Sequence, residues 1–235
     1  MYSKEVNERS PLRVFEKSIH GGLGPGNLGV VMSRAGIGKT AFLIGVALDD
    51  LMRGEQVLHI SFDDSVERIR DFYDVIFGEL KRTTKMKDAA ETHRRVERSR
   101  MIHVYARGEL SVDRLTESIA FLKQHMDFAP RVLIMDGVDF QATSNEELAA
   151  LKALAEQLQV EVWMSAQVHR ADPPDPPVRV ADHVVRFDQY ISVFVLLHPE
   201  EEGSITIQLM KDHDNPNVGD LRMKLDPTSL LLLAE

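Results

Sequence analysis

Short apolar runs and longer amphipathic segments follow one another along this chain. Continuous apolar runs are typical of strands buried in a parallel sheet, and apolar residues at every third or fourth position are typical of helices. The strands predicted in this way span residues 28–32, 56–61, 101–105, 131–135 and 161–165, and helical patterns occur at 41–48, 66–80, 115–126 and 146–158. This alternation predicts an α/β fold with a mainly parallel sheet, right-handed crossovers and helices on both faces.

The pattern changes towards the C-terminus. Residues 171–177 contain so many prolines that we expect an extended loop. Beyond it, apolar runs at 191–197, 204–210 and 221–225 are separated by short polar turns, which predicts an antiparallel extension on one edge of the sheet. We expect residues 1–11 to be a flexible N-terminal segment and residues 12–235 to form one domain.

The clearest chemical signal is the stretch Ser33-Arg34-Ala35-Gly36-Ile37-Gly38-Lys39-Thr40, called the glycine loop below. It joins a predicted strand to a predicted helix, which is the layout of a phosphate-binding loop. Glycines let backbone N–H groups surround phosphate oxygens, and the helix directs its positive end at the same anion. Lys39 can reach the outer phosphates, and the Thr40 hydroxyl can ligate Mg²⁺.

We therefore expect nucleotide binding by the glycine loop together with the first residue after it, that is, by Ser33, Arg34, Ala35, Gly36, Ile37, Gly38, Lys39, Thr40 and Ala41. Ser33 stands where the strict pattern G-x-x-x-x-G-K-[ST] has its first glycine, and Gly36 partly compensates as an extra flexible point. The alternative is a glycine-rich turn that matches the pattern by chance.

Polar residues at other predicted strand ends fit the same chemistry, because ligands of open α/β sheets bind there. Asp136 follows an apolar strand and is expected to hold Mg²⁺, although an aspartate there can also form a turn. Asp63 and Asp64 end another strand and can activate water, with Asp63 favoured as the base, or Asp64 or Ser65 can cap the next helix. Gln167 can sense the γ-phosphate or hold the attacking water, or be an ordinary polar strand end.

Composition excludes several other classes of function. The chain of 235 residues has no cysteine, which excludes disulfides, thiolate metal sites and cysteine nucleophiles, and its net charge of −9 opposes non-specific nucleic-acid binding. No apolar run reaches the ~18 residues of a membrane span, and the N-terminus does not look like a signal peptide, so a cytoplasmic protein is expected. His169, His183 and His213 are too scattered for a metal site and are interpreted as structural or solvent-facing.

Two further stretches have alternative interpretations. Residues 81–100 carry many basic side chains and form either a patch for an acidic partner, a protein or a nucleic acid, or a solvated helix and loop without aromatic residues for base stacking. The basic residues are Lys81, Arg82, Lys85, Lys87, Arg94, Arg95, Arg98 and Arg100. Residues 21–27 form a glycine-dense turn that is either a plain connector or a loop close to the nucleotide.

Several segments resemble, in order, the RecA-fold ATPases of the KaiC type. They are Gly21-Gly22-Leu23 with Gly26, then 34–40, Arg53-Gly54-Glu55, 60–65 and 133–136. Residues 165–170, 191–197, 207–213 and 225–227 resemble the ATPase domain of the replicative helicase DnaB. The resemblance covers the chain from about residue 12. It implies a RecA-like P-loop NTPase core, ATP and Mg²⁺ as cofactors, and a homo-oligomeric ring, often a hexamer, with nucleotide between subunits.

The resemblance also implies a Lys-x-Arg finger supplied by the neighbouring subunit. The matching positions are Lys211 and His213, so a permanently charged forked donor is replaced by one whose charge depends on pH. The family usually has Glu where this chain has Asp63, and a misplacement of roughly 1 Å in a reacting group can cost on the order of 10²-fold in rate. We therefore expect slow hydrolysis.

Three functions follow as expectations. The first is a regulatory ATPase in which nucleotide at a subunit interface changes assembly or partner affinity. The second is a nucleic-acid motor or recombinase, which is disfavoured because residues 169–180 carry Asp172, Asp175 and four prolines and would repel phosphates. The third is a nucleotide-dependent scaffold that does not hydrolyse.

Overall fold

The computed structural model describes residues 11–19, 21–168, 182–200, 203–215, 218, 221 and 223–234. The strands are β1 (Leu28–Ser33), β2 (Val57–Ser61), β3 (Arg100–Val104), β4 (Val132–Asp136), β5 (Glu161–Gln167), β6 (Ile191–Pro199), β7 (Ile205–Asp212), β8 (Met223–Leu225) and β9 (Leu232–Ala234). The helices are α2 (Pro11–Ser18), α3 (Lys39–Arg53), α4 (Val66–Thr84), α5 (Ala89–Ser99), α6 (Val112–Met126), α7 (Asn145–Leu158) and α8 (Asp182–Val185). The proline-rich segment 171–177 and most of the predicted N-terminal segment 1–11 lie outside the described residues.

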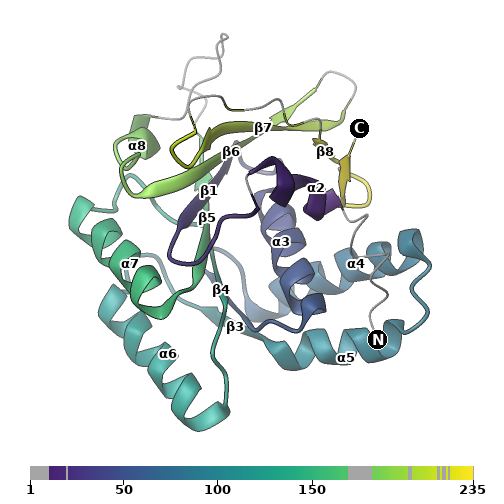
Figure 1. The fold of residues 1–235 in the computed structure, drawn as a ribbon, viewed down its shortest axis with the longest axis horizontal. Helices are drawn as coiled ribbons and strands as arrows, with labels where there is room; N and C mark the ends of the chain where they lie inside the picture. Colours follow the sequence, from purple (N-terminus) through teal and green to yellow (C-terminus); the bar gives the residue numbers. More distant parts are fainter. Residues whose placement is uncertain are drawn as a thin grey trace.

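The nine strands of the described residues belong to one sheet, in the order β3-β2-β4-β5-β1-β6-β7-β8-β9. Figure 1 shows how the helices are arranged around this sheet. Every pair from β3 to β6 is parallel, and the pairs from β6 to β9 are antiparallel. The predicted mainly parallel α/β sheet with an antiparallel C-terminal part is therefore confirmed. The strand predicted at 191–197 joins the two parts of the sheet, because it runs parallel to β1 and antiparallel to β7.

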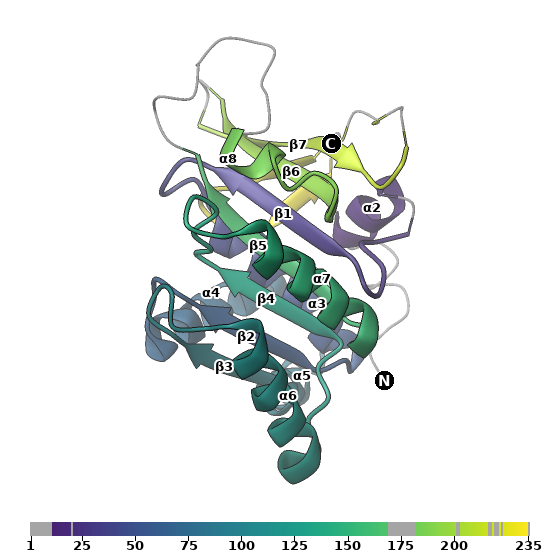
Figure 2. The same ribbon diagram turned by 90° about the vertical axis from the view of Figure 1, so that its left-hand side faces the viewer.

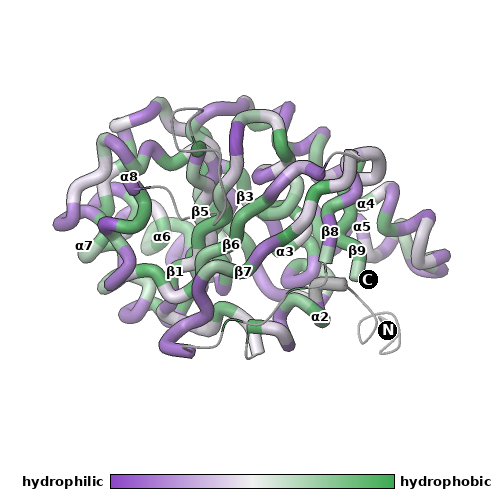
Figure 3. Tube along the Cα trace, turned by 90° about the horizontal axis from the view of Figure 1, so that it is seen from above, coloured by the Kyte–Doolittle hydropathy of each residue, from purple (hydrophilic) through white to green (hydrophobic). Residues whose placement is uncertain are grey.

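Helices cover both faces of the parallel part of the sheet, as Figure 2 shows. One buried cluster joins the sheet to α2, α3, α4 and α5, and the other joins it to α6, α7 and α8. Along β5, Trp163 belongs to the first cluster and Met164 to the second, because successive side chains point to opposite faces. In Figure 3 the central strands are largely hydrophobic, whereas the outer turns are mostly hydrophilic.

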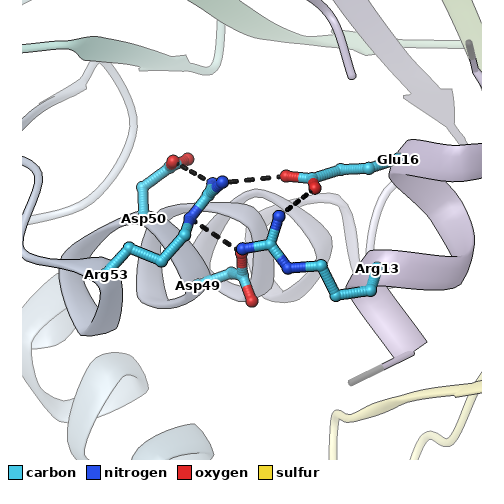
Figure 4. A network of polar contacts seen from close by, with 5 residues as sticks. All are labelled: Arg13, Glu16, Asp49, Asp50 and Arg53. Atoms are coloured by element: carbon cyan, nitrogen blue, oxygen red, sulfur yellow. Dashed lines mark hydrogen bonds and ion pairs between the residues drawn. The ribbon is translucent and has the colours of Figure 1, made fainter. Parts of the chain in front are cut away.

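A partly buried group of five charged residues fixes the N-terminal helix α2 to α3 (Figure 4). Arg13 pairs with Asp49 at 2.9 Å, and Arg53 pairs with Asp49 at 3.3 Å and with Glu16 at 3.2 Å. Arg53 also pairs with Asp50, and Arg13 with Glu16. Burial raises the pKa of Asp50 to about 7, against the opposing effect of Arg53. This group lies beside residues 21–23, at the amino end of β1.

The basic stretch 81–100 forms the end of α4, the whole of α5 and the first residue of β3. Because α5 leads into the amino end of β3, the stretch ends at the amino ends of the strands, whereas the glycine loop begins at the carboxyl end of β1. Arg100 is buried, and its guanidinium stacks on the ring of Tyr73 at 4.3 Å. One of the eight basic residues therefore serves the interior of the protein. No helix in the described part of the chain is long and apolar enough to cross a membrane.

Candidate functional site

The glycine loop joins the end of β1 to the start of α3 and contains two residues with left-handed backbone conformation. Gly36 has φ 78° with open space around its α-carbon, and Gly38, which precedes α3, has φ 105°. A Cβ on Gly38 would lie 2.6 Å from a methyl group of Leu225. Ser33, by contrast, is the buried last residue of β1 and has no positive φ, so this position does not need a glycine. The departure from the strict motif therefore does not distort the loop.

Lys39 folds its side chain back over the loop. Its Nζ donates hydrogen bonds to the carbonyl oxygens of Arg34 at 3.1 Å and Ser33 at 3.3 Å. Burial lowers the pKa of Lys39, while the charges of Asp136 and Asp63 oppose this shift. The ammonium group is thus held in the concave side of the loop, where the sequence predicts a phosphate group.

Thr40 and Asp136 meet across the sheet edge. The Thr40 hydroxyl donates to Asp136 Oδ2 at 2.6 Å, and the Ser165 hydroxyl donates to Asp136 Oδ1 at 2.5 Å. The backbone N–H of Gly137 donates in turn to Ser165 Oγ at 2.8 Å. Burial raises the pKa of the Asp136 carboxyl, although the two hydrogen bonds and Lys39 act in the opposite direction. Asp136 is therefore fixed through both of its oxygens rather than simply forming a turn.

The two aspartates after β2 lie at the same place. Both line the cavity above the glycine loop, and Asp63 packs so closely on Gly137 that a Cβ there would lie 2.5 Å from Asp63 Oδ2. Asp64 pairs with Arg68 at 2.9 Å, whereas Ser65 caps α4 by accepting from the N–H of Arg68. Ser65 is thus the residue that caps α4, and neither Asp63 nor Asp64 has that role.

Arg107 is a cation that the sequence does not single out. It follows β3 and donates to Asp63 Oδ1 from Nε at 2.9 Å and from Nη2 at 2.6 Å. Gln167 ends β5 opposite Ser33 of β1 and lines the same cavity. His183 also lines it and donates to the Gln167 carbonyl at 3.1 Å. The sequence predicts only a structural or solvent-facing role for His183 and gives no sign that it lies beside the site.

These residues surround one cavity of about 220 Å³ at the carboxyl ends of the central strands. Among the described residues, four carboxylates line it, those of Asp63, Asp64, Asp136 and Asp139, and two permanent cations line it, Lys39 and Arg107. An excess of hard oxygen donors suits a divalent cation such as Mg²⁺ better than a bare anion. The donor set next to the glycine loop thus fits a metal–phosphate complex.

The predicted finger residues lie away from this cavity. Lys211 donates to the Asp188 carbonyl at 2.7 Å and pairs with its carboxylate at 3.1 Å. His213 lies between Asp212 at 2.8 Å and the Leu23 carbonyl at 3.0 Å, so it joins the end of β7 to the turn 21–27. That turn precedes the amino end of β1, whereas the glycine loop lies at the carboxyl end of the same strand. Within this chain the turn is therefore a connector. His169 and the loop 169–180 fall outside the described residues.

Ser165, Gly137, Arg107 and Asp139 are site residues that the sequence reasoning missed. Each lies at or just after the carboxyl end of a strand, and this position is the signal that would have found Arg107. The role of Ser165 depends on β5 lying beside β4, which the order of strands along the chain does not specify.

A scan of the chain against models of known protein families found no match, and a search of curated proteins found no relative.

Proposed function

We propose that this protein is a Mg·ATP-binding ATPase with a RecA-like P-loop fold of the KaiC type. The observation that carries the proposal is the hydrogen bond from Thr40 at the end of the glycine loop to Asp136 at the end of β4. A hydroxyl and a carboxylate in contact next to a loop with left-handed glycines are the two protein groups that hold Mg²⁺ on a bound nucleotide in P-loop NTPases.

The remaining residues have complementary roles in this proposal. Lys39 exchanges the carbonyl oxygens of Ser33 and Arg34 for phosphate oxygens, which are better acceptors because they are charged. ATP with Mg²⁺ supplies an electrophilic phosphoryl group, and Asp63, assisted by Asp64, orients and deprotonates the attacking water. Gln167 lies on the β5 side of the cavity, where its amide can hold that water.

We further propose that ATP occupancy acts as a regulatory or assembly switch in the cytoplasm. In a ring, Lys211 and His213 would complete the site of a neighbouring subunit, since both lie outside the cavity of their own chain. Hydrolysis is slow in this account, because Asp63 is one methylene shorter than glutamate and His213 replaces arginine. The basic segment 81–100 is then available to a protein partner.

A nucleic-acid motor is less well supported. The basic segment 81–100 ends at the amino end of β3, whereas the glycine loop begins at the carboxyl end of β1, and Arg100 of the basic segment is buried. A non-hydrolysing scaffold differs from the proposed ATPase only in turnover, so measuring phosphate release separates the two. A salt-dependent shift of labelled single-stranded DNA would instead favour the motor.

The proposal is tested by measuring molecular mass in solution, with and without Mg·ATP, together with phosphate release. We expect the wild-type protein to assemble into a larger species with Mg·ATP and to release phosphate slowly. Lys39→Ala should do neither, whereas Lys123→Ala, which removes the same charge from the exposed face of α6, should behave as wild type. Assembly and phosphate release that Lys39→Ala leaves unchanged would refute the proposal.

A further inference from the structure

The ion pair between Arg107 and Asp63 lines the candidate nucleotide cavity. Both nitrogens of the Arg107 fork point at one oxygen, Asp63 Oδ1, at 2.9 and 2.6 Å. The two side chains come from different strand ends, after β3 and after β2, and both line the cavity with Lys39 and Thr40. The proposed base of the reaction is therefore neutralised by a cation of its own chain.

This ion pair is easily exchanged. The two side chains are 52% and 48% exposed, and exposed ion pairs contribute about 0–1 kcal/mol because water competes for both partners. Arg107 precedes Gly108, whose φ of 79° gives this loop a left-handed residue next to the arginine. A guanidinium group binds phosphate oxygens through two parallel hydrogen bonds, and it remains charged at any working pH.

A terminal phosphate would offer Arg107 a stronger partner than Asp63. Among the described residues, Lys39 is the other permanent cation that lines the cavity, and it is held next to the glycine loop. Arg107 follows β3 and is paired with Asp63 after β2, whereas the glycine loop follows β1, which β5 and β4 separate from β2 in the sheet. In this proposal, the γ-phosphate of a nucleotide whose inner phosphates occupy the loop is the group that reaches towards this second cation.

We infer that Arg107 is a nucleotide-sensing residue that leaves Asp63 for the γ-phosphate when ATP binds. The exchange has two consequences: Arg107 favours ATP over ADP, and the released Asp63 carboxylate becomes available to the attacking water. Without a γ-phosphate, Arg107 returns to Asp63 and the base is blocked. This inference rests on the proposed function, because it requires nucleotide in the glycine loop.

The test compares the affinities of ATP and ADP, each with Mg²⁺, by calorimetric titration of the full chain. We expect Arg107→Ala to weaken ATP binding about tenfold, or about 1.4 kcal/mol, with ADP binding unchanged. Arg68→Ala is the matched control, because Arg68 pairs with Asp64 beside the same site but does not line the cavity. This control should keep the wild-type ratio of ATP to ADP affinity.

A double-mutant cycle with Asp63→Asn tests the exchange itself. Removing the carboxylate frees Arg107, so Asp63→Asn should tighten ATP binding more in the wild-type background than in Arg107→Ala. Equal changes in both backgrounds, or an unchanged ratio of ATP to ADP affinity in Arg107→Ala, would overturn the inference and leave the proposed function standing. If the wild-type protein binds neither nucleotide, the proposed function fails and the inference fails with it.

Discussion

The hydroxyl of Thr40 lies 2.6 Å from a carboxylate oxygen of Asp136, although 96 positions separate the two residues in the sequence. One strand, β5, separates β1 from β4 in the sheet, and both parallel strands end at the same edge. The start of α3 brings Thr40 over that edge towards Asp136. The central claim of the proposed function, a Mg²⁺ site beside a phosphate loop, depends on this contact.

Ser165 holds Asp136 in place for that contact, and removal of its hydroxyl should lower the stability of the protein. Its hydroxyl donates to Asp136 and accepts from the N–H of Gly137, and Ser165 is buried. Ser165→Ala should lower the free energy of unfolding by about 1–3 kcal/mol, because it leaves buried groups without partners. Urea unfolding measures this change, with the exposed Thr116→Ala on α6 as control. Equal stability of the two variants would contradict the structural role of Ser165.

Two features of the structure require a glycine at position 137: its left-handed backbone and the close approach of Asp63. Its φ is 89°, and a Cβ would lie 2.5 Å from Asp63 Oδ2. Gly137→Ala should displace Asp63 and reduce phosphate release on the order of 10²-fold, with ATP still bound. The control is Gly78→Ala in α4, where a Cβ meets open space, and it should stabilise the protein by roughly 0.5–1 kcal/mol. Unchanged phosphate release in Gly137→Ala would show that Asp63 needs no fixed position.

Hydrolysis itself should be slow and should respond to the length of the residue at position 63. We expect Asp63→Glu to raise the rate of phosphate release under saturating Mg·ATP and Asp63→Ala to abolish it, because the base is one methylene too short. A stopped-flow phosphate sensor measures both rates. Wild-type turnover of several per second, with no gain in Asp63→Glu, would remove Asp63 as the limiting group.

Asp50 should make stability depend on pH. Burial raises its pKa to about 7 in the folded protein, from an ordinary value of 3.8. The folded state therefore binds more protons than the unfolded state between about pH 4 and pH 7, and the free energy of unfolding falls as pH rises through this window. One proton contributes a slope of at most about 1.4 kcal/mol per pH unit.

Asp50→Asn isolates this contribution from the other charged groups around it, namely Glu16, Asp49, Arg53 and Glu161. The free energy of unfolding of the variant, measured with urea from pH 4 to pH 8, should fall less steeply than that of the wild-type protein up to about pH 7. Parallel curves for the two proteins would mean that Asp50 keeps an ordinary pKa in the folded state.

Much of the fold follows from the sequence because apolar periodicity is strong where burial is complete. The five strands predicted between 28 and 165 and the four main helical patterns all match observed elements. Helix α5 was not predicted as a separate element, because its buried face consists of Ala89, Thr92 and Val96 among basic residues. The direction of β6 depends on how the chain returns after β5, which local periodicity does not encode.

The site was predictable as far as motifs and strand ends reveal it. The glycine loop, Asp63, Asp64, Asp136 and Gln167 are each found from local sequence, and the structure brings them to one cavity. The partners that fix them are set by strand order and loop conformation. Ser165 reaches Asp136 because β5 lies beside β4, and Arg107 reaches Asp63 because β3 lies beside β2. Neither pairing is encoded in a run of neighbouring residues.

The most direct test of the account is the Mg²⁺ dependence of ATP binding at Thr40. ATP is titrated calorimetrically in Mg²⁺ and in EDTA, for the wild-type protein, Thr40→Ser and Thr40→Val. Serine keeps the hydroxyl, and valine keeps the branched shape without it. We predict that Mg²⁺ strengthens ATP binding in the wild-type protein and in Thr40→Ser, and that Thr40→Val loses this gain. Equal ATP affinities with and without Mg²⁺ in the wild-type protein, or a Mg²⁺ effect that Thr40→Val retains, would contradict the proposed metal–nucleotide site.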